Sequence, residues 1–151
     1  MTKQETENKP KKNQPTKFFY LIAGLAFIWN LLGVMAFVGQ IFTSSEMIAQ
    51  MPQAEQKLYN STPIWATAAF AFAVFGGTLG SLVILMRREF ALKLLILSLI
   101  GVLIQMFHSF FISDSIKVYG LSAIVMPIMV VTIAIALILW TKHLSVKGVL
   151  R

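Results

Sequence analysis

Residues 63–86 read PIWATAAFAFAVFGGTLGSLVILM, an apolar stretch that contains no charged residue. A helix needs about 20 such residues to cross the roughly 30 Å hydrocarbon core of a bilayer. Similar stretches lie before and after it, at residues 18–42, 90–112 and 120–141. Unbroken apolar runs favour helices over the strands of a membrane barrel, in which apolar and polar residues alternate. The sequence therefore predicts an all-α polytopic membrane protein, a four-transmembrane-helix bundle.

The composition agrees with this fold class. Hydrophobic residues make up 57% of the 151 residues, whereas soluble domains contain about 45–50%. The formal net charge of +7 could indicate nucleic-acid binding, but the basic residues lie at the edges of the apolar runs and form no single basic face. We therefore expect the lipid bilayer as a partner and no nucleic acid. The absence of cysteine excludes disulfides and thiolate metal sites.

Polar segments bound the membrane domain at both ends. Residues 1–17 are basic and rich in polar residues, and we expect a disordered cytoplasmic tail there. Residues 18–141 form the four-helix transmembrane domain, and residues 142–151 a second cytoplasmic tail.

The positions of lysine and arginine predict the orientation of the chain. Five lie in the N-terminal tail, three between residues 87 and 93, and three in the C-terminal tail, against only Lys57 and Lys117 in the other two connections. Cytoplasmic loops carry the excess of positive charge in membrane proteins. We therefore expect both termini in the cytoplasm.

The longest connection, residues 43–62, carries signals of short helices. Thr43 and Glu46 have the spacing of a capping box, in which the hydroxyl and the carboxylate each bond a free backbone N–H. Pro52 interrupts this segment, and residues 53–59 could form another short helix. Ser61 or Thr62 is expected to cap the second span.

Polar side chains inside the spans are the main candidates for function, because such groups are costly in lipid. Asn30 lies near the middle of the first span, and Gln105 and His108 share one face of the third. A structural interpretation is also open and is the more common one for such residues, because interhelical hydrogen bonds between them stabilise membrane bundles by about 0.6–2 kcal/mol. A neutral His108 bonded to a neighbour or to interfacial water belongs to this second interpretation.

Glycines indicate where helices approach closely. Gly76 and Gly80 have the GxxxG spacing in the second span, and Gly33 belongs to a stripe of small residues in the first. Missing side chains allow neighbouring backbones to come near each other. We expect these three residues to pack helices, although the glycines of the second span could instead supply flexibility at a transport site.

The sequence lacks the residues that several kinds of chemistry require. The spans contain no acidic residue, which argues against a proton-coupled multidrug exchanger. The sequence shows no nucleophile–base pair, phosphate loop or metal-ligand cluster. We therefore expect no enzyme, no catalytic residue, no cofactor and no metal.

Three apolar stretches and one loop phrase are informative together: residues 29–36, 63–70 with 75–80, and 97–106, with the loop phrase at residues 56–59. They resemble a family of small bacterial four-helix membrane proteins that often carry the automatic label "sugar transporter". The resemblance covers roughly residues 25–110, and it implies the bacterial cytoplasmic (inner) membrane and a sugar-like solute.

Two functions remain open from the sequence. In the first, the chain is transporter-like: Asn30, Gln105 and His108 hydrogen-bond a small neutral solute, and Trp29 or Trp65 stacks on a sugar ring. Four helices rarely enclose a pathway alone, so this function needs a homo-oligomer. In the second, the chain is an accessory or structural protein that packs against a larger membrane partner. A cavity shared by the polar residues would favour transport, and bonds between them in a dry core would favour the accessory role.

The orientation can be tested with single cysteines, because the chain has none of its own. A cysteine at Ser44 or Ser115 should react with an impermeant thiol reagent added to intact cells. A cysteine at Thr2 or Ser145 should react only after the cells are opened. Labelling of these last two positions in intact cells would reverse the predicted orientation.

Overall fold

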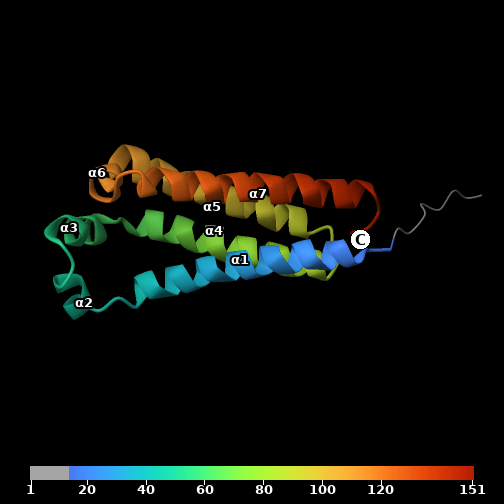
Figure 1. The fold of residues 1–151 in the computed structure, drawn as a ribbon, viewed down its shortest axis with the longest axis horizontal. Helices are drawn as coiled ribbons and strands as arrows, with labels where there is room; N and C mark the ends of the chain where they lie inside the picture. The colour runs from blue at the N-terminus through green and yellow to red at the C-terminus, as the bar shows by residue number, and fades with distance from the viewer. Residues whose placement is uncertain (1–13) are drawn as a thin grey trace, which may run out of the picture.

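The computed structural model describes residues 14–151, and in this range the fold is all-α, as expected. Four long helices form the body of the molecule, and short helices lie in two of the connections (Figure 1). The elements in chain order are α1 (Lys17–Ile41), α2 (Ser45–Ala49), α3 (Gln53–Ser61), α4 (Ile64–Leu85), α5 (Ala91–Phe107), the π-helical segment η1 (His108–Ile112), α6 (Ser115–Tyr119) and α7 (Ser122–Val146).

Each long helix suits a bilayer by length and composition. α1 and α7 have 25 residues, α4 has 22, and α5 with η1 also has 22. At about 1.5 Å per residue, 22 residues span about 33 Å, slightly more than the roughly 30 Å of hydrocarbon. Large apolar side chains are exposed along all four helices. These features describe a multi-pass membrane protein.

The helices begin and end close to the expected spans, with one extension. α7 continues past Thr141, the expected end of the fourth span, to Val146. α1 begins at Lys17 because the Thr16 side chain accepts a hydrogen bond from the Phe19 N–H. Most of the expected disordered tail, residues 1–13, lies outside the described residues.

Two expected helix caps are wrong, although a short helix follows Pro52 as predicted. Ser44, not Thr43, caps α2 by accepting from the Met47 N–H, while the Thr43 hydroxyl donates back to the Gly39 carbonyl. Helix α1 leaves a free carbonyl at Gly39 that competes for this hydroxyl. Thr62 likewise donates to the Leu58 carbonyl of α3, so Pro63 precedes α4 without a side-chain cap.

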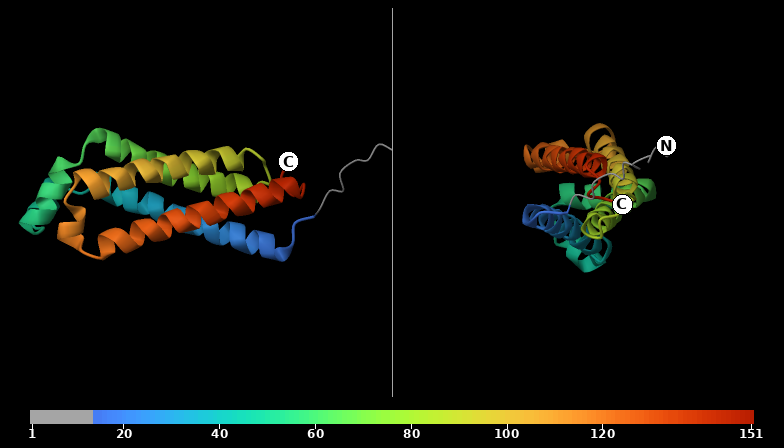
Figure 2. Two further views of the ribbon diagram at one scale, coloured as in Figure 1. Left: turned by 90° about the horizontal axis from the view of Figure 1, so that it is seen from above. Right: turned by 90° about the vertical axis from the view of Figure 1, so that its right-hand side faces the viewer.

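The long helices follow one another in space in chain order. α1 packs on α4, α4 on α5, and α5 on α7, with successive helices running in opposite directions. The termini of the described chain therefore lie at one end, here called the terminal end, and α2, α3 and α6 lie at the other (Figures 1 and 2). α1 diverges from α7 toward the end that carries the short helices.

The closest contact in the bundle joins α4 to α5. A Cβ atom added to Gly101 would lie 2.7 Å from the Ala69 carbonyl oxygen and 2.8 Å from the Ala73 nitrogen. Gly76 lies against Ser98, and Gly80 against the Leu95 side chain. The absence of side chains therefore lets these two helices touch at their backbones.

A buried apolar cluster closes the terminal end. It combines residues of all four long helices with the segment that follows α7, where Val149 and Leu150 are 6% and 2% exposed. The Arg151 N–H donates to the Arg87 carbonyl at 2.7 Å, and the Glu89 N–H donates to the Arg151 carbonyl at 3.0 Å. The cluster consists of Phe19, Ala23, Ile84, Ala91, Leu95, Leu137, Leu144, Val149 and Leu150.

The α4–α5 contact predicts unequal effects of two glycine-to-alanine changes. Gly101→Ala should lower the thermal stability of the purified protein, because the methyl group overlaps backbone atoms that cannot rotate away; overpacking of this kind costs about 1–3 kcal/mol. Gly24→Ala is the control, because a Cβ there meets nothing within 4 Å. It should leave stability unchanged or raise it slightly through helix propensity. Equal unfolding temperatures for the two variants in detergent would contradict the proposed contact.

Candidate functional site

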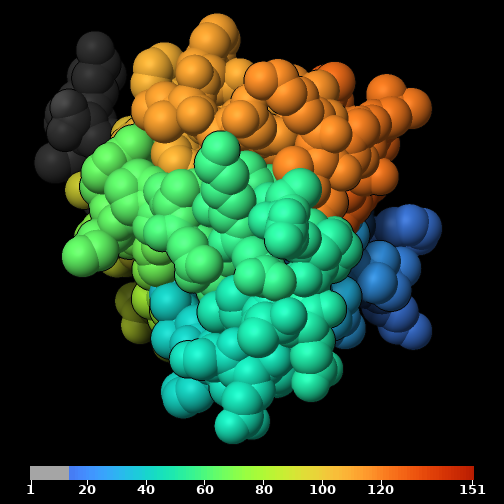
Figure 3. All heavy atoms as spheres, turned by 90° about the vertical axis from the view of Figure 1, so that its left-hand side faces the viewer, coloured from blue at the N-terminus to red at the C-terminus, as the bar shows by residue number. Residues whose placement is uncertain are grey.

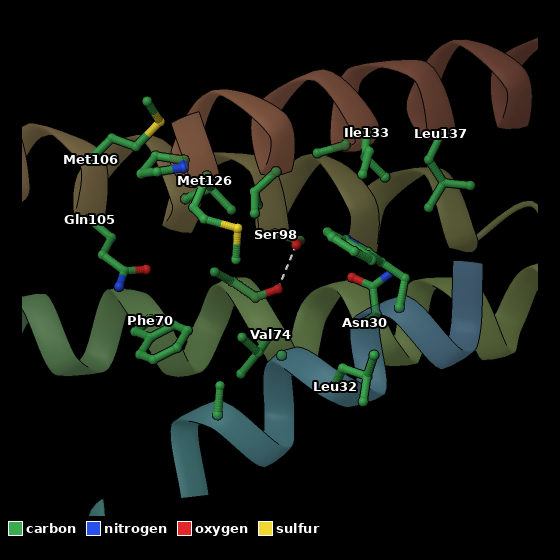
Figure 4. A pocket seen from close by; sticks show the side chains of 18 of the residues that line it. Asn30, Leu32, Phe70, Val74, Ser98, Gln105, Met106, Met126, Ile133 and Leu137 are labelled. Atoms are coloured by element: carbon green, nitrogen blue, oxygen red, sulfur yellow. Dashed lines mark hydrogen bonds between the residues drawn. The ribbon is translucent and has the colours of Figure 1, made fainter. Parts of the chain in front are cut away.

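The four long helices line a cavity of about 440 Å³, here called the bundle cavity (Figure 4). Its volume falls in the range of about 300–1,000 Å³ that is typical of small-molecule sites. It is lined by Trp29, Asn30, Leu32, Gly33, Ala36, Phe70, Ala73, Val74, Leu95, Ser98, Val102, Gln105, Met106, Ser109, Met126, Pro127, Val130, Ile133, Ala134 and Leu137.

A second space of about 290 Å³, here called the polar pocket, adjoins the bundle cavity toward the short helices. Phe70, Gln105 and Ser109 line both spaces and form the neck between them. Across the neck, the Gln105 side chain extends from α5 toward α4, which carries Phe70 (Figure 4). The polar pocket is lined by Gln40, Leu58, Tyr59, Thr62, Ala66, Thr67, Phe70, Gln105, His108, Ser109, Ser113, Ser115 and Tyr119.

Asn30 joins α1 to α4 through its amide. Its Nδ2 donates to the Ser81 hydroxyl at 3.0 Å and to the Ala26 carbonyl of its own helix at 2.8 Å. The Ser81 hydroxyl in turn donates to the Gly77 carbonyl. The Asn30 Oδ1 atom occupies the place where a side chain on Gly77 would be, so only glycine fits there without moving the amide. The two N–H groups of Asn30 are therefore already used within the bundle.

Ser98 makes a second polar contact between helices. Its hydroxyl donates to the Ala73 carbonyl of α4 at 2.5 Å, the bond drawn in Figure 4. Ser98 is 6% exposed and lies at the wall of the bundle cavity. Its hydrogen is thus directed into the α4–α5 contact and away from the cavity.

Gln105 differs from Asn30 and Ser98. Within the described part of the chain, no protein group hydrogen-bonds to its side-chain amide or to the Ser109 hydroxyl. No described side-chain nitrogen or oxygen is both fully buried and without a partner, so these polar atoms remain accessible from the neck. An amide of this kind can donate two hydrogen bonds and accept others.

His108 stands at the start of η1, where the helix widens. It is 7% exposed, and its ring meets Trp65 edge to face at a centroid distance of 5.3 Å. The Ser113 N–H bonds back to the His108 carbonyl, which is the π-helical pattern. Local π-helical turns occur often at functional sites. Here the turn places His108 at the wall of the polar pocket.

The structure brings together some of the predicted site residues and separates others. Asn30, Trp29 and Gln105 line the bundle cavity, with Asn30 and Gln105 well separated along it (Figure 4). Trp65 lines neither space and instead packs on His108. Gly33 lines the cavity next to Val74, whereas Gly76 and Gly80 lie in the α4–α5 contact.

Four residues that form helix contacts were not among the predicted site residues: Gly77, Ser81, Ser98 and Gly101. Each is small and forms part of a helix contact. Ala91, Leu95, Ser98 and Gly101 follow one another at steps of three or four residues, and all are buried. This spacing marks one face of α5, and it was the available signal for Ser98 and Gly101.

The side chains that line the two spaces, within residues 14–151, carry no formal charge. Among the described residues that line them, none is Asp, Glu, Lys or Arg. The described residues also contain no group of three or more His, Cys, Asp or Glu side chains that could hold a metal ion. The arrangement therefore suits the binding of an uncharged molecule.

Comparison of the chain with known protein families, with curated proteins and with solved structures found no match.

The contact between Asn30 and Gly77 predicts a coupled pair of substitutions. Gly77→Ala should destabilise the protein by about 1–3 kcal/mol, because the new methyl group displaces the Asn30 amide from Ser81. In a chain that already carries Asn30→Ala, the same change should cost much less. Thermal unfolding of the four proteins in the double-mutant cycle measures the coupling. Equal costs in the two backgrounds would show that the amide does not occupy this position.

Proposed function

We propose that the chain is a transporter-like membrane protein that binds a small neutral solute in the bundle cavity. The observation that supports this best is the free amide of Gln105 at the neck. A polar group inside a membrane helix normally finds a partner within the protein, because an unpaired one costs several kcal/mol in hydrocarbon. Asn30 and Ser98 follow this rule, and Gln105 does not. A bound solute would complete its hydrogen bonds.

The proposal extends to the place of the protein in the cell. We infer a bacterial cytoplasmic membrane with the terminal end inside, supported by the lysines and arginines that gather near that end. In this orientation the closed apolar cluster faces the cytoplasm and the polar pocket faces outward. Passage of a solute would then require the cluster around Ile84 and Leu150 to open.

One side of the bundle cavity is open between α1 and α7, where another protein chain could bind. Leu32 and Met126 line the cavity and are 54% and 55% exposed, so one side of the cavity is not covered by this chain. We propose that a second copy or a larger membrane protein could cover α1 and α7 and complete an enclosed path.

One observation favours the accessory role as a second candidate. Asn30 directs both N–H groups into the helix contact, which is the arrangement that we associated with a structural protein. Under this alternative, Gln105 is an idle group near the interface, and the bundle serves to present α1 and α7 to a partner.

Solute release from liposomes tests the proposal. The purified protein is reconstituted in phosphatidylethanolamine–phosphatidylglycerol liposomes loaded with radiolabelled glycerol, glucose or butanediol. We expect faster release of at least one of them than from empty liposomes. Gln105→Leu should lower this release about tenfold, the effect of one hydrogen bond of about 1.4 kcal/mol. It should not lower the unfolding temperature, because the Gln105 side chain has no hydrogen bond to lose within the described residues.

Gln50→Leu is the matched control, since it makes the same chemical change at an exposed position outside both spaces. It should leave release unchanged. If no solute leaves faster than from empty liposomes, and Gln105→Leu is silent in every assay, transport is wrong and the accessory role is favoured.

A further inference from the structure

We infer that the bundle cavity takes an uncharged single-chain amphiphile, such as a long-chain alcohol or a monoacylglycerol, which enters from the bilayer between α1 and α7. This inference rests on the proposed function, in which the cavity binds a neutral solute, and it names the class of that solute.

The wall of the bundle cavity is mostly apolar. Most of the residues that line the cavity have aliphatic or methionine side chains, such as Val102, Met126 and Ile133. The donors of Asn30 and Ser98 are engaged in helix contacts. A sugar would place several hydroxyl groups against this wall without partners, which is unfavourable. A hydrocarbon chain would contact apolar side chains along this wall.

The polar groups without a protein partner among the described residues gather at one end of the cavity. Gln105 and Ser109 lie together at one end of the bundle cavity, and His108 lies just beyond them in the polar pocket. Figure 4 shows Gln105 near one end of the cavity and Leu137 near the other. A molecule with one polar head and one apolar chain matches this arrangement, with its head at the neck and its chain directed toward Leu137.

The route of entry follows from the helix arrangement. Phe19 and Trp140 bring α1 and α7 together at the terminal end, with ring centroids 5.8 Å apart, and the two helices then diverge. The exposed lining residues Leu32 and Met126 lie on these two helices, one on each. The opposite end of the bundle is covered by α2, α3 and α6, with α3 against α6 (Figure 3). A molecule dissolved in the bilayer would therefore reach the cavity from the lateral side, which faces lipid.

Selectivity would reside in the head group. A chain that leaves the bilayer for the cavity moves from one apolar surrounding to another, so burial alone gives little preference. Hydrogen bonds to Gln105 and Ser109 distinguish a hydroxyl head from bulk lipid tails. A carboxylate or phosphate head would find no lysine or arginine among the lining residues that the structure describes, so charged lipids fit less well.

Photolabelling of the purified full-length chain tests this inference. The probe is dodecanol with a diazirine near the end of its chain, and adducts are located by mass spectrometry. Because the chain end is directed toward Leu137, we expect adducts on residues at that end of the cavity, such as Ile133 and Leu137, and competition by unlabelled dodecanol. Dodecanoate at neutral pH and glucose should not compete. Gln105→Leu should reduce the cavity adducts about tenfold, the loss expected for one hydrogen bond.

A pair of phenylalanine substitutions separates the cavity from the lipid surface. Ala134→Phe fills the cavity from α7 and should abolish the cavity adducts, whereas Leu139→Phe on the same helix, at a position 61% exposed, should not. Unfolding temperatures confirm that both variants are folded, and if Ala134→Phe is not, Gln105→Leu remains as the test. Adducts spread evenly over exposed positions such as Leu139 would overturn the inference.

The failure of this inference can be distinguished from that of the proposed function. If glucose or glycerol displaces the probe, or is released from liposomes in a Gln105-dependent way while dodecanol does not bind, the cavity binds a solute of another class. If neither dodecanol nor any solute depends on Gln105, both proposals are wrong.

Discussion

The contact of α4 with α5 at backbone distance determines the rest of the structure. Gly76 and Gly101 have no side chains that would hold these helices apart. The Ser98 hydroxyl joins the two helices by donating a hydrogen bond to the Ala73 carbonyl. α1 then packs on the outside of α4, and α7 on the outside of α5. The outer helices meet near Phe19 and Trp140 at the terminal end. The bundle cavity is the space that this geometry leaves between them.

Polar groups in hydrocarbon need hydrogen-bond partners, and this need explains how the polar side chains at the cavity wall are arranged. Asn30, Ser81 and Ser98 bond to other groups of the bundle and so contribute to its stability. Gln105 and Ser109 keep their hydrogen-bonding capacity at the neck, where the helix widens into η1. The wall therefore divides into a part that holds the helices together and a part that is available to a ligand.

The sequence was sufficient for the fold class and the approximate helix bounds, because length and hydropathy alone identify a membrane span. It could not give the inner face of each helix. α1 and α7 are apolar all round, so no amphipathic stripe distinguishes the side toward protein from the side toward lipid. The polar residues Asn30 and Gln105 were found because such groups are rare in spans. The contact between Asn30 and Gly77 joins residues of different helices, which only the three-dimensional arrangement brings together. The helix cap at Ser44 likewise depends on which neighbours are in reach.

The segment after α7 has a consequence for how the protein is made. Arg87 adopts a left-handed conformation with φ of 60° at the end of α4, and its side chain and carbonyl both bond to residues 149–151. The turn between the second and third spans thus acquires its partners from the part of the chain that is synthesised more than fifty residues later. Segments nearer the N-terminus fold first during synthesis. The earlier helices are therefore in the membrane before residues 149–151 are made, and this end of the bundle acquires its closing contacts only after that.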